Sequence, residues 1–130
     1  MKPGRINSGI IAIVDDDQPL RDALASVLKA AGFSVITYGS AEEFLRSFGL
    51  QATACLVLDV RLPGMSGVEL QRHLIESGKS VPIIFVTAHG DDCLRDLLMK
   101  AGAKGFLSKP VRSDALLAEI DAAISTSAGE

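Results

Sequence analysis

Residues 15–17 are three consecutive aspartates, and they directly follow the apolar run at residues 10–14. Like charges at the end of a buried strand repel one another and resist removal from water unless a cation holds them. Asp15 and Asp16 therefore predict a metal site, and Mg²⁺ suits it because Mg²⁺ prefers one or two carboxylates together with waters and a phosphate oxygen. Asp17 fits equally well as the cap of the helix that follows.

Asp59, Thr87 and Lys109 also follow apolar runs and carry groups that suit phosphate chemistry. Asp59 can share the metal, and a carboxylate beside Mg²⁺ can act as a nucleophile on phosphorus. Lys109 offers a mobile positive charge to one phosphate oxygen, and the Thr87 hydroxyl can donate a hydrogen bond to another. Since phosphoryl transfer needs mainly positioning and charge neutralisation, these residues predict an aspartyl phosphate as the product.

The elements that position these residues alternate between strand and helix along the chain. β-Rich or apolar runs predict strands at residues 10–14, 34–38, 54–58, 81–86 and 104–108. Apolar residues at helical spacing predict helices over about residues 19–31, 40–48, 66–75, 94–101 and 116–124. Ser40 and Ser66 each stand three residues before a glutamate, which is the spacing of a capping box.

Five strand–helix units with nearly continuous apolar strands predict an α/β fold, in which helices cover both faces of a parallel sheet. For a chain of 130 residues, the flavodoxin-like strand order 2-1-3-4-5 fits best. Ligands of such sheets bind beyond the carboxyl ends of the strands. The aspartates at residues 15–17, Asp59, Thr87 and Lys109 are therefore expected along one edge of the sheet.

Composition predicts one domain. The pattern of strands and helices places it at residues 10–124, with a flexible tail at residues 1–9 and a flexible tail or the start of a linker at residues 125–130. A hydrophobic content of 48% with 22% charged residues is ordinary for a chain that buries a core. The net charge of −3 and the pI near 5.3 provide no basic surface for phosphates. We therefore expect no binding of nucleic acid or of an anionic membrane by this domain alone.

The remaining sequence signals predict a cytoplasmic protein. No apolar run approaches the roughly 20 residues that span a bilayer, and the chain does not start with a signal segment. Cys55 and Cys93 have no CxxC spacing, and we interpret both as small apolar filler residues in a reducing compartment.

Four motifs together resemble the receiver domain of bacterial two-component response regulators. They are Val-Asp-Asp-Asp at residues 14–17, Leu-Asp-Val-Arg-Leu-Pro-Gly at 58–64, Val-Thr-Ala at 86–88 and Lys-Pro at 109–110. Asp59 follows Asp16 by 43 residues and precedes Thr87 by 28 and Lys109 by 50, spacings that match the family. Each motif alone is weak evidence, but four in order on the expected strands are strong. The resemblance covers about residues 10–124.

The resemblance implies a phosphorylation site centred on Asp59, the phosphoacceptor. Asp15, Asp16 and Asp59, together with the backbone carbonyl of Arg61, would hold Mg²⁺, for which Mn²⁺ can substitute. The residues two positions after the acceptor and after the threonine, Arg61 and His89, lie near the phosphoryl group in receivers and influence its hydrolysis there.

The resemblance also implies a conformational switch. Lys109 and Thr87 would contact the phosphoryl group, and Phe106 occupies the place of an aromatic residue that moves inward when the threonine turns. The bond between Lys109 and Pro110 resembles a cis bond of the family that aims the lysine inward. The switch would change the surface of the fourth helix, fifth strand and fifth helix, through which phosphorylated receivers of this type form homodimers.

The implied partners are a sensor histidine kinase or a phosphotransfer protein of a phosphorelay. Thr-Ala-His-Gly-Asp at residues 87–91 resembles the FixJ-like subgroup, in which a receiver usually accompanies a helix-turn-helix DNA-binding domain that regulates transcription. No such domain follows here, and the polar segment at residues 125–130 fits either a natural end or the start of a linker.

Three other functions compete with this interpretation. A phosphorylation-independent interaction module could share the fold. A haloacid-dehalogenase-like phosphatase also uses an aspartyl nucleophile and Mg²⁺. Its signature is DxDx followed by Thr or Val, and the sequence Asp-Asp-Asp-Gln-Pro at residues 15–19 does not match it. A flavodoxin would need hydroxyl residues where the aspartates stand, because carboxylates repel flavin phosphate. An EF-hand is excluded, since Leu20 replaces the glycine required at the sixth loop position.

Overall fold

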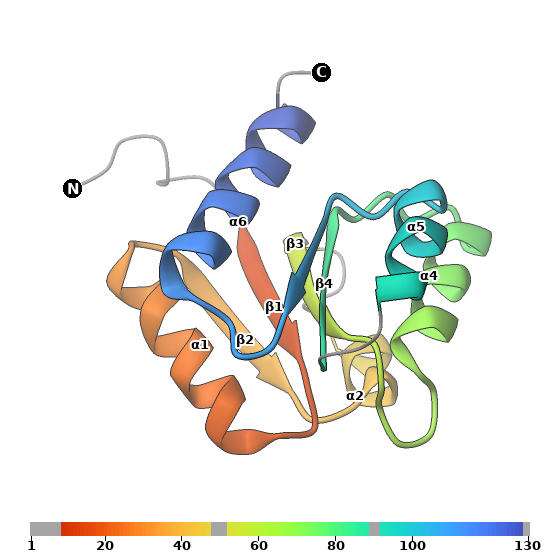
Figure 1. Cartoon of the computed structure of the whole chain (residues 1–130), viewed down its shortest axis with the longest axis horizontal. Helices are drawn as coiled ribbons and strands as arrows, with labels where there is room; N and C mark the ends of the chain where they lie inside the picture. Colours follow the sequence, from red (N-terminus) through yellow and green to blue (C-terminus); the bar gives the residue numbers. More distant parts are fainter. Residues whose placement is uncertain (1–8, 48–51, 89–91, 129–130) are drawn as a thin grey trace.

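The computed structural model describes residues 9–47, 52–88 and 92–128. Five parallel strands form one sheet in the order β2-β1-β3-β4-β5, which confirms the predicted fold class (Figure 1). The strands are β1 (Ile10–Val14), β2 (Ser34–Tyr38), β3 (Thr53–Asp59), β4 (Ile83–Thr87) and β5 (Gly105–Ser108).

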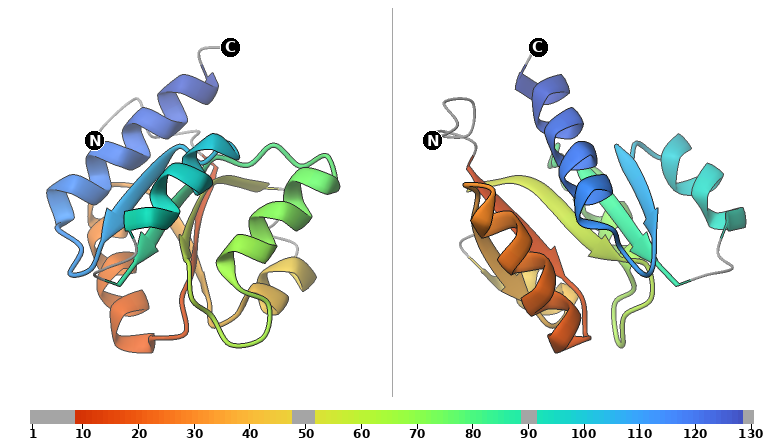
Figure 2. Two further views of the ribbon diagram at one scale, coloured as in Figure 1. Left: turned by 45° about the vertical axis from the view of Figure 1, so that its right-hand side comes forward. Right: turned by 60° about the vertical axis from the view of Figure 1, so that its left-hand side comes forward.

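The helices cover both faces of the sheet, as the alternating pattern predicted. They are α1 (Gln18–Ala30), α2 (Ala41–Arg46), α4 (Gly67–Glu76), α5 (Asp92–Lys100) and α6 (Ser113–Ala128). Helices α1 and α6 lie on one face, and α2, α4 and α5 lie on the other (Figures 1 and 2). Among the described residues, no helix is long and apolar enough to cross a membrane.

The core consists of two apolar layers separated by the sheet. Ile11 and Ile13 of β1 point into the layer beneath α1 and α6. Ala12 and Val14 point into the layer beneath α2, α4 and α5. A strand that is buried on both faces needs apolar residues at every position, because successive side chains alternate between the faces. Burial of the central strands on both faces therefore explains the continuous apolar runs of the sequence.

Side-chain caps set the starts of the helices. The Asp17 carboxylate accepts a hydrogen bond of 3.2 Å from the Leu20 amide at the start of α1, so Asp17 acts as a cap. Ser66 and Glu69 form the predicted capping box at the start of α4, with reciprocal hydrogen bonds of 3.1 Å and 2.9 Å. These caps begin α1 and α4 immediately after the loops that follow β1 and β3.

Some predicted boundaries need correction: α6 begins at Ser113 instead of about residue 116, and its end and the start of β4 also differ. The tail expected from Ser125 is wrong for residues 125–128, because α6 continues to Ala128. No glycine or proline stops the helix there before Gly129. Strand β4 begins at Ile83, two residues later than predicted, since Pro82 has no amide hydrogen for the sheet. The Pro82 carbonyl still accepts a hydrogen bond of 2.8 Å from Leu56.

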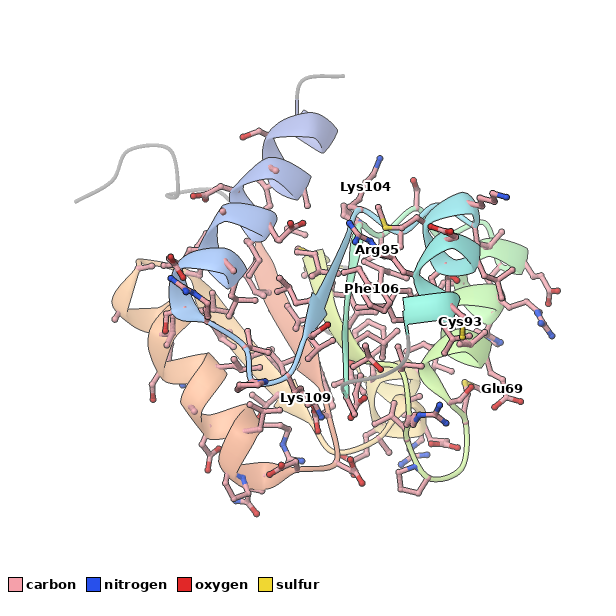
Figure 3. The ribbon with its side chains drawn as sticks, in the orientation of Figure 1. Glu69, Cys93, Arg95, Lys104, Phe106 and Lys109 are labelled. Atoms are coloured by element: carbon pink, nitrogen blue, oxygen red, sulfur yellow. The ribbon has the colours of Figure 1, made fainter. Side chains whose placement is uncertain are left out.

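The two cysteines differ in their surroundings. Cys55 is fully buried in β3, and burial raises the pKa of its thiol to about 12. Cys93 is exposed on α5, so the prediction that it fills the core was wrong (Figure 3). Leu94 and Leu98 are four residues apart and form the apolar stripe of α5. Cys93 lies beside that stripe and not within it.

We expect iodoacetamide at about pH 8 to alkylate Cys93 in the native protein and to leave Cys55 unmodified, because a buried, protonated thiol does not react. The raised pKa of Cys55 also stabilises the fold below the unfolded thiol value of about 8.5. That contribution should fade as the pH rises from there toward about 12. Peptide mass mapping measures the alkylation, and native Cys93→Ser should stay unlabelled. Alkylation of Cys55 without denaturant would contradict the described burial.

Candidate functional site

The carboxyl ends of four strands bring the predicted site residues together at one edge of the sheet. Asp59 and Thr87 are the last residues of β3 and β4, Asp15 follows β1 and Lys109 follows β5. Asp15, Asp59 and Thr87 are 2%, 5% and 1% exposed. Among the described residues, four polar side chains are buried, and three of them belong to this edge. Such a concentration of buried polar groups indicates a functional site.

Lys109 joins the two buried carboxylates. Its ammonium nitrogen lies 3.2 Å from Asp59 Oδ2 and 3.3 Å from Asp15 Oδ2. The Lys109 amide donates a hydrogen bond of 2.8 Å to the Thr87 carbonyl, which continues the pairing of β4 with β5 and sets where the side chain begins. The peptide bond between Lys109 and Pro110 is cis. Figure 3 shows Lys109 at the edge where the strands end.

Burial and neighbouring charges act in opposite directions on the Asp59 carboxyl. Burial raises its pKa, and the negative charge of Asp15 raises it further. A hydrogen bond of 3.1 Å from the Arg61 amide and the Lys109 ammonium lower it, yet the pKa stays above its usual value. Burial alone would lower the pKa of Lys109, but the carboxylates of Asp59 and Asp15 outweigh burial and raise it.

The carboxylates of Asp15, Asp16 and Asp59 could hold a metal ion. One oxygen from each lies within 4.8 Å of the others, a separation that a single divalent cation can bridge. Asp16 is exposed, so one side of this group is open to water. The Lys109 ammonium contacts two of the three carboxylates, those of Asp15 and Asp59, and the clustered negative charge favours a hard cation such as Mg²⁺.

Backbone contacts near Asp15 fix its position, and the sequence had not pointed to them. The Arg21 guanidinium donates a hydrogen bond of 2.5 Å to the Asp15 carbonyl, and the Asp15 amide donates to the Tyr38 carbonyl at 3.1 Å. The Asp15 carboxylate accepts a hydrogen bond of 2.9 Å from the Asp17 amide. These bonds hold the carboxylate of Asp15 toward Lys109.

Glu42 of α2 supports the loop between β3 and α4, and it too was missed. Its carboxylate accepts a hydrogen bond of 2.8 Å from the Met65 amide, and this bond lowers the pKa of Glu42. Gly64, next to Met65, has a φ of +73°, which favours glycine. Glu42 lies 23 residues before its partner, and its neighbour Glu43 takes the capping position. No local pattern could therefore have indicated this contact.

Gly67 lets α4 approach the end of β3 closely. A Cβ atom at Gly67 would meet the Asp59 carbonyl oxygen and would lie 3.0 Å from the Val60 Cα. The Gly67 amide donates a hydrogen bond of 3.0 Å to the Val60 carbonyl. Glycine is unfavourable in a helix, so a glycine inside a capping box was a signal of close packing.

The remaining predicted residues lie at or beyond the edge of the site. Arg61 is exposed, and its amide contacts Asp59. Phe106 is half-buried in β5 and packs against the layer that α2, α4 and α5 cover (Figure 3). His89 lies outside the described residues.

The order of the strands and the acidic residues at one edge of the sheet are features of receiver domains. A model of the family described as "Response regulator receiver domain" matches residues 11–121. The chain therefore belongs to the response regulator receiver domain family. This membership argues against the flavodoxin and phosphatase alternatives.

Two bacterial response regulators are similar in sequence to this chain. The response regulator protein TodT of Pseudomonas putida is 44% identical over 117 residues, which are 90% of this chain and 52% of TodT. The transcriptional regulatory protein FixJ of Bradyrhizobium diazoefficiens is 40% identical over 116 residues, which are 89% of this chain and 57% of FixJ. The chain thus spans about half the length of these relatives.

Solved structures of relatives share the fold. FixJ-N has a TM-score of 0.81 and 39% sequence identity, with 90% of this chain and 94% of FixJ-N covered. The response regulator StyR has a TM-score of 0.85 and 43% identity, with 92% of this chain and 61% of StyR covered.

We expect Gly67→Ala to lower the free energy of unfolding by about 1–3 kcal/mol, because the added methyl group pushes α4 away from Asp59 and Val60. Urea denaturation measures the change. Gly39→Ala is the matched control, since a Cβ there would meet its nearest atom at an ordinary 3.5 Å. Equal stability of the two variants would show that close packing at Gly67 is unimportant.

Proposed function

We propose that this domain accepts a phosphoryl group on Asp59 from a sensor histidine kinase or a phosphotransfer protein, in a reaction that depends on Mg²⁺. The observation that carries the proposal is the placement of Asp59. Its carboxylate is buried, contacts Lys109, and lies within bridging distance of Asp15 and Asp16. Membership of the receiver family supports the same chemistry.

The reaction would transfer the phosphoryl group in one displacement. An Asp59 carboxylate oxygen attacks phosphorus, the bond between phosphorus and the donor nitrogen breaks, and the donor histidine keeps the electron pair. Asp15, Asp16, Asp59 and the Arg61 carbonyl would hold Mg²⁺, which supplies positive charge for the phosphoryl oxygens when it is bound.

The neighbours of Asp59 prepare it for this step. The Arg61 amide holds one carboxylate oxygen, which fixes the orientation of the group. The Lys109 ammonium donates a hydrogen bond to the other oxygen. As the new bond forms, the ammonium can donate this hydrogen bond to a phosphoryl oxygen instead. The Thr87 hydroxyl, at the end of the adjacent strand, would donate to a further phosphoryl oxygen.

Phosphorylation would then change the surface formed by α5, β5 and α6. Movement of Thr87 toward the phosphoryl group leaves room for Phe106, whose half-buried ring lies on β5 between the core and solvent. We propose that the altered surface pairs two copies of the domain. The side chains of Arg61 and His89 would influence how long the phosphoryl group persists.

The output that we propose is regulation of transcription. FixJ, which shares 40% identity with this chain, is a transcriptional regulatory protein. The acidic balance of this domain makes it unsuited to contact DNA directly. Within this proposal, residues 10–124 act as the receiving unit and pairing of that unit passes the signal on.

Incubation with acetyl phosphate and Mg²⁺ should add one phosphoryl group to the wild type, as intact mass spectrometry would show. Asp59→Asn should stay unmodified, because an amide is a poor nucleophile. Asp114→Asn is the matched control, since Asp114 is exposed and pairs with Arg112 away from the site. Removal of Mg²⁺ with a chelator should suppress the modification. An unmodified wild type, or equal modification of Asp59→Asn, would overturn the proposal.

Beryllofluoride, which mimics a phosphoryl group on aspartate, should increase the sedimentation coefficient of the wild type in the presence of Mg²⁺. The cause would be pairing through the surface of α5, β5 and α6. Asp59→Asn should sediment equally with and without the mimic. Sedimentation of the wild type that does not respond to beryllofluoride would contradict pairing and leave the chemistry at Asp59 unaffected.

A further inference from the structure

A groove of about 320 Å³ lies between α4 and α5. These two helices cover the same face of the sheet as α2 (Figure 2). Most of its lining is apolar and includes Val68 and Ile75 from α4 and Leu97 from α5. Ile75 is 53% exposed and Leu97 is 59% exposed, the highest values for large apolar side chains in the described part of the chain. Apolar surface is thus concentrated at one place.

Gln71 gives this groove a buried hydrogen-bonding group. The side chain lines the groove and is 4% exposed, and it is the one buried polar side chain of the described residues outside the edge that holds Asp59. Its amide nitrogen donates a hydrogen bond of 3.3 Å to the Leu98 carbonyl near the end of α5. A carbonyl oxygen can only accept, so this contact fixes which end of the amide faces Leu98.

The hydrogen bond to Leu98 uses the amide nitrogen of Gln71, which leaves the amide oxygen as an acceptor. Within the ranges that the structure describes, no protein donor reaches this oxygen. Buried acceptors nearly always have a donor, and an apolar side chain of similar size would fill the same place without needing one. Because Gln71 lines the groove, we infer that this oxygen is the acceptor available to a molecule that occupies it.

The dimensions and the charge balance define what such a molecule is. The volume falls within the range of about 300–1,000 Å³ that is typical of small-molecule sites, which combine apolar walls with few polar groups. Arg72 and Glu76 both line the groove, so the net charge of its lining favours a neutral ligand. Because the apolar lining offers one hydrogen-bond acceptor, a matching ligand is an apolar molecule with one hydrogen-bond donor.

We propose that the groove between α4 and α5 binds a small neutral molecule with an apolar ring system and a single N–H or O–H donor, which bonds to the Gln71 amide oxygen. The site is separate from the carboxylates at the strand ends, and binding is expected in the unphosphorylated protein. Its ligand inserts the ring between Ile75 and Leu97 and removes both from water.

Indole and 1-methylindole test this proposal, because they differ in the single N–H donor. Titration of the uniformly ¹⁵N-labelled wild type, followed by amide chemical shifts, should give saturable changes in α4 and α5 with indole. The affinity for 1-methylindole should be about fivefold lower, as expected for the loss of one neutral hydrogen bond. Absence of saturable shifts, shifts confined to other elements, or equal affinity for the two probes would overturn the proposal.

Substitutions assign the two parts of the site. Gln71→Met removes the acceptor and should erase the preference for indole; the Leu98 carbonyl keeps its hydrogen bond from the Ala103 amide, so α5 retains its end. Leu97→Gln should weaken both probes while the preference for indole remains. Met99→Gln is the matched control, because Met99 is exposed on α5 but does not line the groove. A preference that persists in Gln71→Met would also refute the assignment.

Discussion

Repulsion among the carboxylates at the strand ends is the interaction that the rest of this structure has to balance. Strands β1 and β3 are neighbours, so Asp15 and Asp59 emerge side by side, and β4 separates them from the strand that carries Lys109. Neighbouring strands lie about 4.8 Å apart, so the backbone of Lys109 stands about 10 Å from that of β3 and farther from β1. The lysine and the aspartate side chains close this distance together, which leaves the ammonium 3.2 Å from Asp59 Oδ2 and 3.3 Å from Asp15 Oδ2.

Residues outside the site hold this balance in place. Arg21 binds the backbone of Asp15, Glu42 binds the loop after β3, and Gly67 lets α4 pack against the carbonyl of Asp59. None of the three carries the proposed chemistry. Each fixes a backbone segment from which a functional side chain projects, and a displacement of about 1 Å in such a segment can cost a large part of the activity of a site.

The sequence predicted those features that depend on local order. The strand ends that carry Asp59 and Thr87 follow from apolar runs that stop at a polar residue, and the strand order follows from the alternation of strands and helices. Partners such as Glu42 and Met65 are distant along the chain, so only the folded structure brings them together. Cys93 was misassigned because residue type alone does not tell which side of a helix faces the core, and Gln71 was not singled out for the same reason.

Tyr38 gives the protein an optical property of its own. The chain contains one tyrosine and no tryptophan, so a single ring dominates the fluorescence excited at about 280 nm, where phenylalanine hardly absorbs. That ring packs edge-on against Phe44 at a centroid distance of 5.4 Å, and the Tyr38 carbonyl accepts the hydrogen bond of the Asp15 amide. The emitting residue is therefore joined through its backbone to the backbone of Asp15, and a spectroscopist needs no added dye to observe that end of β2.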